Sequence, residues 1–486
     1  MVTNQSEKNI RELFGNRIAI YGVGVTGQAV LDYLRSKSLT AVVIDDSPYE
    51  NLKNLLSNYE DIITRSFIGD LPRDWGSLFS SIDTMIISPG IKLDPKAEEI
   101  AREKNIPIIS EIEMAYRLCK GKIIAVTGSN GKSTVVTMIH QILIKAGITS
   151  HLVGNIGKPF ISIVDEVNEG DWVVVEVSSY QLERIEKFKP AIALITNITE
   201  DHLARHGDMK GYIAAKGRIF ENQNSDDHAI INHEEPNTWR AFGNASSKLH
   251  IFASVDFEDL PVSEYINGHL VEACAALKSD MLAFRIDSEI DEIMSISELQ
   301  VPGEHNIQNA LASALAAHHA GVASKAIASA LKEFKGIEHR IEFLGEIDGV
   351  LYYNDSKATN VDSTITALKA LSTGTIRLIL GGSEKGSDFN LLYRFLKDRK
   401  ESLTLYLTGP SGRRMADEIE TGNWNLKFTL FDSFEKASNA VFNDAKDGDT
   451  ILLSPACASF DEFKNFEERG RKFKELLIRF INGKSD

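Results

Sequence analysis

The segment Gly128-Ser-Asn-Gly-Lys-Ser-Thr134 combines residue types that bind a nucleotide triphosphate. Glycines let the backbone approach phosphate oxygens, and the amides of the turn and of a following helix point at the negative charge. Lys132 adds a point charge and Ser133 a hydroxyl for Mg2+. Val126 stands where the usual phosphate loop has its first glycine. We predict a phosphate loop whose nucleotide-binding residues are Gly128, Asn130, Gly131, Lys132, Ser133 and Thr134.

Three further side chains could act beside this loop. Glu176 lies at the end of an apolar run over residues 172–177, where a Mg2+ ligand or a water-activating carboxylate belongs in an α/β sheet. His202 follows the apolar run over residues 191–196, and Lys216 lies in a segment of helical character. Taken singly, His202 reads as a structural histidine and Lys216 as a solvated helix lysine.

Two other regions predict ligand-binding turns. Gly22-Val-Gly-Val-Thr-Gly27 follows a predicted strand and opens a helix, as in dinucleotide-binding domains, with Asp45 and Asp46 ending the next strand. In the last third of the chain, polar loops over residues 354–360, 381–386 and 454–461 each follow a predicted strand. We expect these three loops to gather at the carboxyl edge of one sheet.

The elements that position these residues alternate between strands and helices, which predicts an α/β fold with three domains. We expect a Rossmann-like first domain over residues 1–117, a central P-loop-type ATPase domain over 118–337 and a Rossmann-like third domain over 338–486. Each should contain an open, mostly parallel sheet. The polar stretch over residues 222–300 is expected to form a β-rich insertion, whose strands the pattern does not locate.

Composition narrows the class of protein. The 486 residues are 43% hydrophobic and 25% charged, as in globular proteins, and the net charge of -16 argues against nucleic acid or an anionic membrane as partner. The three cysteines are far apart and suggest neither a zinc site nor a disulfide framework. No signal peptide or membrane span is predicted, so we expect a cytoplasmic protein.

Taken together, these motifs resemble those of the Mur ligase family of ATP-dependent amide-bond-forming enzymes. The resemblance rests on Thr127-Gly-Ser-Asn-Gly-Lys-Ser133, on Glu176, on Asn197-Ile-Thr-Glu-Asp-His202, on Lys216 and on the long segment over residues 454–470. It covers essentially the whole chain. It implies that D-glutamate is joined to UDP-N-acetylmuramoyl-L-alanine through an acyl phosphate, with ATP and two Mg2+ ions, by a monomer in peptidoglycan synthesis.

The resemblance also implies roles for individual residues. Lys132, His202 and Lys216 would be catalytic, and Ser133, Glu176, His202 and a carbamylated Lys216 would hold the metal. Asn306 and Asn309 would line the adenine, with Arg340 and Asp355 gripping the ATP. The substrate-binding set would be Gly24, Val25, Thr26, Gly27, Asp46, Ser47 and Ser88 on the UDP side, Asn155 and Ser178 in the centre, and Lys357, Thr359, Lys385, Ser459 and Phe466 around D-glutamate.

The chain departs from the family pattern at two places. Ser47-Pro48 stands where many relatives have Thr-Arg, and Ala204 where relatives often have Asp. Three other functions stay open at this point. Folylpolyglutamate synthase shares the central loop but does not need the first glycine motif, and the same glycine motif also suits an NAD-dependent dehydrogenase. A non-catalytic nucleotide-binding regulator is disfavoured because Glu176, His202 and Lys216 are all present.

Overall fold

The structure, a computed structural model, describes residues 10–200, 203–243, 245–260, 265–266, 268–286, 289–301, 303–371, 374–384, 387–399 and 402–484. The chain folds into two compact units. The first comprises Met1–Glu298 and Ile307–Lys332, and the second comprises Leu299–Asn306 and Glu333–Asp486. The first unit contains two sheets and the second contains one.

The first sheet is parallel, with strand order β3-β2-β1-β4-β5. The order reverses beside β1, so the turn after this strand lies where open α/β sheets bind ligands. The elements are β1 (Ile18–Tyr21), α2 (Val25–Ser36), β2 (Ala41–Asp45), α3 (Tyr49–Ser57), β3 (Ile63–Ile68), α4 (Trp75–Ser81), β4 (Thr84–Ile87), α5 (Pro95–Glu103), β5 (Ile108–Ser110) and α6 (Glu111–Leu118).

The central sheet has the strand order β15-β14-β13-β11-β10-β9-β6-β8-β7, with β12 paired to β13. Its nucleotide-binding part comprises β6 (Lys122–Thr127), α7 (Lys132–Lys145), β7 (Ser150–Gly154), β8 (Trp172–Glu176), α8 (Ser179–Leu182), β9 (Ile192–Ile195), α9 (Leu203–His206), α10 (Met209–Gly217), α12 (Glu304–His319) and α13 (Ser324–Glu333). Strands β6 to β11 are parallel to their neighbours.

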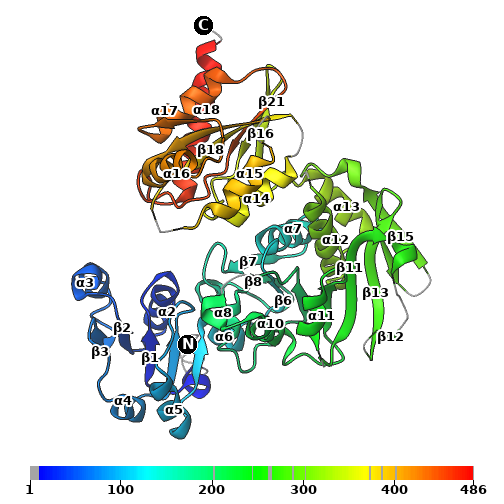
Figure 1. Cartoon of the computed structure of the whole chain (residues 1–486). Coiled ribbons are helices and arrows are strands. Elements are labelled where there is room, and N and C mark those ends of the chain that lie inside the picture. The colour runs from blue at the N-terminus through cyan, green and yellow to red at the C-terminus, as the bar shows by residue number, and fades with distance from the viewer. Residues whose placement is uncertain are drawn as a thin grey trace. The chain divides into compact units, whose positions relative to one another are not determined.

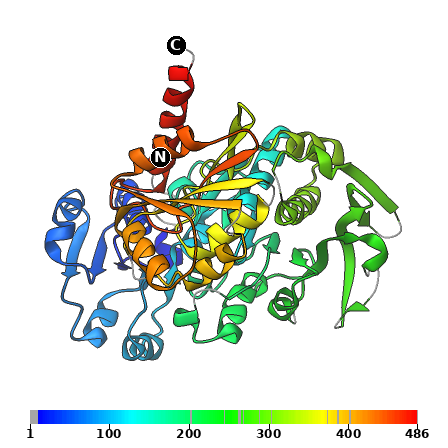
Figure 2. The ribbon, with the colours of Figure 1, turned by 45° about the horizontal axis from the view of Figure 1, so that its top comes forward.

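The stretch over residues 222–300 is rich in strands, as expected, but it extends the central sheet rather than standing apart. After β10 (His228–Asn232) and α11 (Pro236–Phe242), β11 (Lys248–Asp256) and β13 (His269–Lys278) continue the parallel part. Strands β14 (Met281–Ile286) and β15 (Glu289–Ser295) then pair antiparallel, and β12 (Tyr265–Ile266) is a short edge strand. These strands form the green end of the sheet at the right of Figure 1 and Figure 2.

The third sheet has the order β16-β17-β21-β18-β19-β20, parallel except for the β16–β17 hairpin. Its strands are β16 (Glu342–Ile347), β17 (Val350–Asn354), β18 (Thr375–Gly381), β19 (Leu403–Thr408), β20 (Phe428–Phe431) and β21 (Asp449–Leu453). Helices α14 (Val361–Ala370), α15 (Asn390–Lys397) and α16 (Gly409–Thr421) pack in one apolar cluster, whereas α17 (Phe434–Asp444) and α18 (Phe466–Lys484) pack in another. The sheet therefore lies between two helical layers (Figure 1).

The first two sheets share one hydrophobic core that extends from Ile10 to Ala283. The buried carboxylate of Glu113 links them further, because it accepts hydrogen bonds from the backbone amides of Glu186, Lys187 and Phe188, all at 2.9 Å. The α/β class and mostly parallel sheets predicted from sequence are confirmed. The domain boundaries at residues 117 and 337 stay a prediction.

Candidate functional site

The predicted phosphate loop lies between β6 and α7, at the carboxyl edge of the central sheet. Gly128 and Gly131 have φ angles of 147° and 83°, a region that favours glycine. A Cβ at Gly128 would lie 1.9 Å from Thr196 Oγ1, and one at Gly131 would lie 2.6 Å from Asn309 Oδ1. Gly131 is also the N-cap of α7 and offers no side-chain cap, so the helix N-terminus suits an anion.

Val126 is a strand residue and not part of the loop. It is fully buried and pairs with Glu176 of β8 and Leu194 of β9. A glycine at position 126 would not stabilise the strand, because a strand in the middle of a sheet packs through apolar side chains. The usual first glycine is therefore absent because β6 extends past residue 126, to Thr127.

The segment after β9 holds the loop in place. The backbone amide of Asn130 donates to Asn197 Oδ1 at 2.9 Å, and Thr196 Oγ1 donates to the Asn130 carbonyl at 2.6 Å. The Ser129 hydroxyl donates to the Thr199 carbonyl at 3.0 Å. Asn197 and Thr199 belong to the motif over residues 197–202, but the sequence predicted no individual role for them or for Thr196. The signal was their position directly after a strand adjacent to β6.

Two lysines lie at the loop. Lys132 Nζ donates to the carbonyls of Gly128 and Ser129, both at 2.8 Å. Lys216, on α10, is buried, and its Nζ donates to the Gly128 carbonyl at 2.7 Å and lies 4.7 Å from the centre of the Tyr212 ring. The structure therefore brings Lys216 to the phosphate loop, and it is not a solvated helix lysine.

Glu176 is buried at the end of β8, and one of its carboxylate oxygens accepts a hydrogen bond from Asn155 Nδ2 at 2.8 Å. Its other oxygen, Oε2, is buried and has no hydrogen-bond partner among the described residues. An ionised oxygen without a partner is costly in a protein interior, so it calls for a cation. A carboxylate and the nearby serine hydroxyl of the loop are oxygen donors of the kind that Mg2+ prefers. These residues therefore fit a Mg2+ ion.

Other predicted residues of the centre are placed as follows. The Ser178 hydroxyl caps α8 and forms a reciprocal pair with Gln181. Ser133 and Thr134 are buried in the first turn of α7, and Asn309 is buried against Gly131. His202 lies outside the described residues.

The first glycine motif forms a tight turn between β1 and α2. Gly22 has a φ of 93°, and a Cβ at Gly27 would lie 2.0 Å from the Gly22 carbonyl oxygen. Gly24 is the N-cap of α2, with no side-chain cap and open space around it. The Asp45 carboxylate accepts from the amides of Val23 at 2.8 Å and Ser47 at 2.9 Å. Asp45 thus braces the turn, which leaves the exposed Asp46 as the side chain available for a ligand.

The three polar loops of the third domain do come together. The Gly381 amide donates to the Pro455 carbonyl at 2.9 Å, and the Ser383 amide donates to the Ala458 carbonyl at 2.9 Å. Arg469 joins the remaining loop, because its buried guanidinium donates to the carbonyls of Ser356 at 2.8 Å and Cys457 at 3.0 Å. The prediction that these loops gather at one sheet edge is confirmed.

Asp355 lies at the centre of this loop cluster. It is buried and accepts from Ser454 Oγ at 2.7 Å and from the Ile341 amide at 3.2 Å. Burial raises the pKa of its carboxyl to about 7, although the Ser454 hydrogen bond opposes the shift. This group can therefore hold or release a proton near neutral pH.

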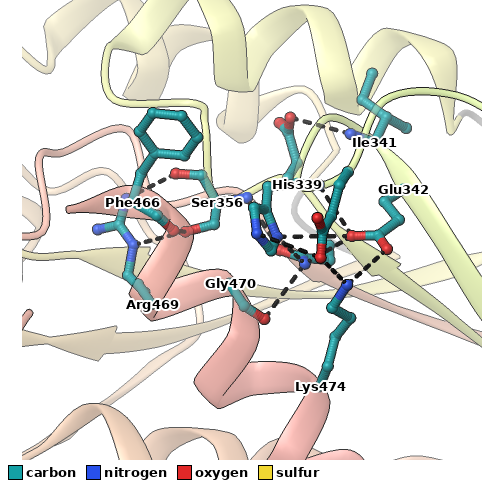
Figure 3. A network of polar contacts seen from close by, with 11 residues as sticks. His339, Ile341, Glu342, Ser356, Phe466, Arg469, Gly470 and Lys474 are labelled. Carbon is teal, nitrogen blue, oxygen red and sulfur yellow. Dashed lines mark hydrogen bonds and ion pairs between the residues drawn. The ribbon is translucent and has the colours of Figure 1, made fainter. Parts of the chain in front are cut away.

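A polar network anchors the linker segment to the third domain (Figure 3). The buried His339, with a φ of 67°, lies 2.8 Å through Nδ1 from Asn354 Nδ2, which also donates to Glu342. Lys474 Nζ, on α18, donates to Glu342 Oε1 at 2.9 Å. A Cβ at Gly470 would lie 2.2 Å from His339 Nδ1, so α18 needs glycine there. The contacts of His339 and Glu342 on either side thus fix the turn that contains Arg340.

The residues expected around D-glutamate all belong to this domain. Lys357 Nζ lies 5.9 Å from the centre of the Phe466 ring, and Ser459 is buried in the loop after β21. Thr359 follows in the same loop as Lys357. Lys385 lies outside the described residues. Their roles stay a prediction, as do those of the other site residues.

Comparison with known proteins identifies the family. The Mur ligase MurD-like N-terminal domain matches residues 16–110, the Mur ligase middle domain matches 126–317, and the Mur ligase glutamate ligase domain matches 339–457. The chain belongs to the Mur ligase family. It is therefore an ATP-dependent, amide-bond-forming ligase of a family that generally needs Mg2+.

One relative is the UDP-N-acetylmuramoylalanine--D-glutamate ligase of Thermoanaerobacter pseudethanolicus, which is 38% identical over 96% of this chain and 99% of its own length. Among solved structures, a pseudomurein peptide ligase type C from Methanothermus fervidus aligns with a TM-score of 0.55 at 20% identity, over 96% of this chain and 100% of that one. UDP-N-acetylmuramate-alanine ligase MurC from Thermotoga maritima aligns with a TM-score of 0.54 at 18% identity, over 96% and 99%. These two likenesses concern the fold alone.

Proposed function

We propose that this Mur ligase joins D-glutamate to the L-alanyl carboxylate of UDP-N-acetylmuramoyl-L-alanine during cytoplasmic peptidoglycan precursor synthesis, acting as a monomer. The observation that supports this most is the 38% identity, over 96% of the chain, to a relative named for that activity. None of the described helices combines the length and the apolar character required to cross a bilayer.

The reaction activates a poor electrophile. A carboxylate oxygen attacks the γ-phosphorus of ATP, the bond to the bridging oxygen breaks, and ADP leaves. The neutral amine of D-glutamate then attacks the carbon of the acyl phosphate, the C–N bond forms, the bond to the phosphate oxygen breaks and phosphate departs, and the nitrogen loses one proton. Phosphate leaves far more readily than oxide, which is why the first step is needed.

The residues of the phosphate loop would stabilise this charge transfer. The amides at the start of α7 and the Lys132 ammonium would face the transferred phosphoryl group, where charge develops. Ser133, Glu176, His202 and Lys216 would hold two Mg2+ ions, and the unpartnered Oε2 of Glu176 supports this assignment. Bound Mg2+ would neutralise the approach of two anions.

Lys216 would act as a carbamate. CO2 adds to the neutral amine, a C–N bond forms and one proton leaves, so that a cation beside the metal site becomes an anionic oxygen ligand. The burial of Lys216 against the Gly128 carbonyl supports this idea. We expect a Lys216→Ala variant to lose ligase activity and to regain part of it with acetate or another short carboxylate. Failure of every short carboxylate to rescue the variant would count against the carbamate.

The remaining residues would bind the substrates. The UDP group would bind at the first glycine turn, formed by Gly24, Val25, Thr26 and Gly27, together with Asp46, Ser47 and Ser88. Asn155 and Ser178 would contact the reacting end. ATP would be held by Asn306, Asn309, Arg340 and Asp355, and D-glutamate by Lys357, Thr359, Lys385, Ser459 and Phe466.

The test is ATP-dependent phosphate release with UDP-N-acetylmuramoyl-L-alanine and a panel of D- and L-amino acids. We expect stimulation by D-glutamate alone, and none when the UDP substrate is omitted. Stimulation by a different amino acid would overturn the proposed specificity. Activity with a folate in place of the UDP substrate would instead favour a folylpolyglutamate synthase.

A further inference from the structure

Three histidines lie together in the central domain, away from the proposed ligase site. His228 begins β10, His250 lies in β11 and His319 ends α12, and one ring nitrogen of each lies within 4.8 Å of the other two. His228 pairs with Ile192 at the start of β9, so the cluster lies near the amino edge of the sheet. The phosphate loop follows the carboxyl end of β6, at the opposite edge.

The strand register places two of these rings on one face. In the parallel pair β10–β11, His228 lies opposite Lys248 and Ile230 lies opposite His250. His250 is therefore two positions further along the strand direction than His228, so both side chains point to the same face of the sheet. His228 Nδ1 lies 2.9 Å from His250 Nε2. The His319 ring then packs over both, with centroids 4.4 Å from His228 and 3.9 Å from His250.

The cluster contains ring nitrogens that lack partners. His250 Nδ1 and His319 Nε2 are buried and accept or donate no hydrogen bond within the described part of the chain. Each unpaired buried polar atom costs roughly 1–3 kcal/mol, so two of them in one cluster need compensation. A histidine cluster that merely fills the core would gain from apolar replacements.

The protonation state suits a metal rather than a proton. Burial lowers the pKa of all three imidazoles, that of His319 to about 3, and Lys248 adds to the effect. The Asp227 carboxylate opposes this lowering of the His228 pKa, and it is itself paired with Lys189 at 3.1 Å. Neutral imidazole is the form that metals bind.

We propose that His228, His250 and His319 form a site for a divalent transition-metal ion of the Zn2+ class, separate from the Mg2+ site. Neutral imidazole nitrogens suit Zn2+, Co2+ and Ni2+, whereas Mg2+ prefers oxygen ligands. Three nitrogens about 2.0–2.1 Å from a tetrahedral ion lie roughly 3.3 Å apart. The rings stack with interplanar angles of 23° to 37°, so at least one ring must rotate before the three in-plane lone pairs converge on the ion. The half-buried His228 leaves room for water as fourth ligand.

Such an ion would tie α12 to the central sheet. Because α12 also places Asn309 against Gly131, the ion would stabilise the element that supports the phosphate loop. No chemical step of the ligase reaction requires it. The expected consequence is a more stable central domain with unchanged basal activity.

The test uses the full chain, freed of metal with a chelator and kept in excess Mg2+. Zn2+ titration by calorimetry should show one saturable equivalent, and Co2+ should give the absorption bands of a tetrahedral nitrogen site. His228→Asn and His319→Ala should each weaken Zn2+ binding by at least about tenfold. His318→Ala, one residue away on α12, is the matched control and should bind normally.

The half-buried His228→Asn is the variant least able to disturb folding, and its circular dichroism spectrum checks this. Absence of saturable Zn2+ binding in the natural chain would overturn the proposal. So would Zn2+ binding that persists unchanged in both variants, since the ion would then lie elsewhere.

Discussion

At the scale of single residues, Glu176 is the side chain whose charge matters most for the proposed reaction. A Glu176→Gln variant keeps the oxygen that Asn155 contacts but loses the negative charge of the buried, unpartnered oxygen. We expect ligase turnover to fall about 10²–10³-fold, as when one charge-stabilising group is removed. Thermal stability should not fall, because the variant no longer buries an unpaired charge.

The measurement is ADP release at saturating substrates, with Glu166→Gln as control, since Glu166 is an exposed carboxylate in the same domain. Full activity of Glu176→Gln across a Mg2+ titration would contradict the assignment of Glu176 to the metal.

Asp355 should make stability depend on pH. Its folded-state pKa of about 7 lies above the ordinary aspartate pKa of 3.8, so the folded protein binds this proton more tightly than the unfolded chain. The free energy of unfolding therefore falls as pH rises from about 4 to 7, by an amount on the order of a few kcal/mol. Asp355→Asn removes this loss, because its amide oxygen can still accept from the Ile341 amide while its NH2 group donates to Ser454 Oγ instead of accepting from it.

The melting temperatures of both proteins, measured from pH 5 to pH 8, check this expectation. The Asn variant should gain stability relative to the natural chain as pH rises, with the difference largest at pH 8. A constant difference over the range would show that Asp355 does not titrate there.

The positions of candidate site residues could be predicted from the sequence where a motif is local, and their roles stay a prediction. The glycines of both turns, Lys132 and Glu176 could be identified because each follows a recognisable strand. The contact of Asn197 with the Asn130 amide could not be predicted, because it depends on which strand lies beside β6. The histidine cluster was missed for the same reason, since its members are far apart in the chain and show no ligand spacing.

At the scale of elements, α18 contains a glycine that its packing requires. A methyl group at Gly470 would collide with the His339 ring, which is buried and held by Asn354. We expect Gly470→Ala to lower the free energy of unfolding by about 1–3 kcal/mol, as overpacking does. Gly483, in the same helix, has open space around it, so Gly483→Ala should be neutral or slightly stabilising.

Differential scanning calorimetry of the full chain compares the two variants. Equal melting temperatures for Gly470→Ala and the natural chain would mean that α18 moves away from His339 at little cost.

Elements themselves were predictable where apolar runs are buried on both faces. The apolar runs at residues 41–45 and 350–354 coincide with β2 and β17, because strands covered on both faces of a sheet read as continuous apolar segments. The strands between residues 222 and 300 were not located. β13 mixes exposed and buried residues, and its partners are chosen by long-range pairing with β11 and β14.

At the scale of the whole molecule, the three sheets belong to two compact units. The first two sheets share a hydrophobic core and are joined through Glu113, whereas the third sheet belongs to a unit of its own. Sequence patterns indicate where strands and turns lie, but they do not show which sheets share a core. Because the chain forms two compact units, we expect its unfolding to show two transitions rather than three.

Two substitutions should separate these transitions. In Glu113→Gln, an NH2 group replaces one of the two carboxylate oxygens. One oxygen accepts from the backbone amides of Glu186 and Phe188, and the other accepts from the Lys187 amide and the Arg117 guanidinium. Whichever oxygen is replaced, the new donor would face other donors. Removing one partner of such a buried charged network costs about 3–5 kcal/mol. Glu113→Gln should lower the transition of the first unit only, and Gly470→Ala that of the second only. Calorimetry of both variants and of the double variant measures this. If either substitution lowers both transitions together, the units unfold as one, and the division inferred from packing is wrong.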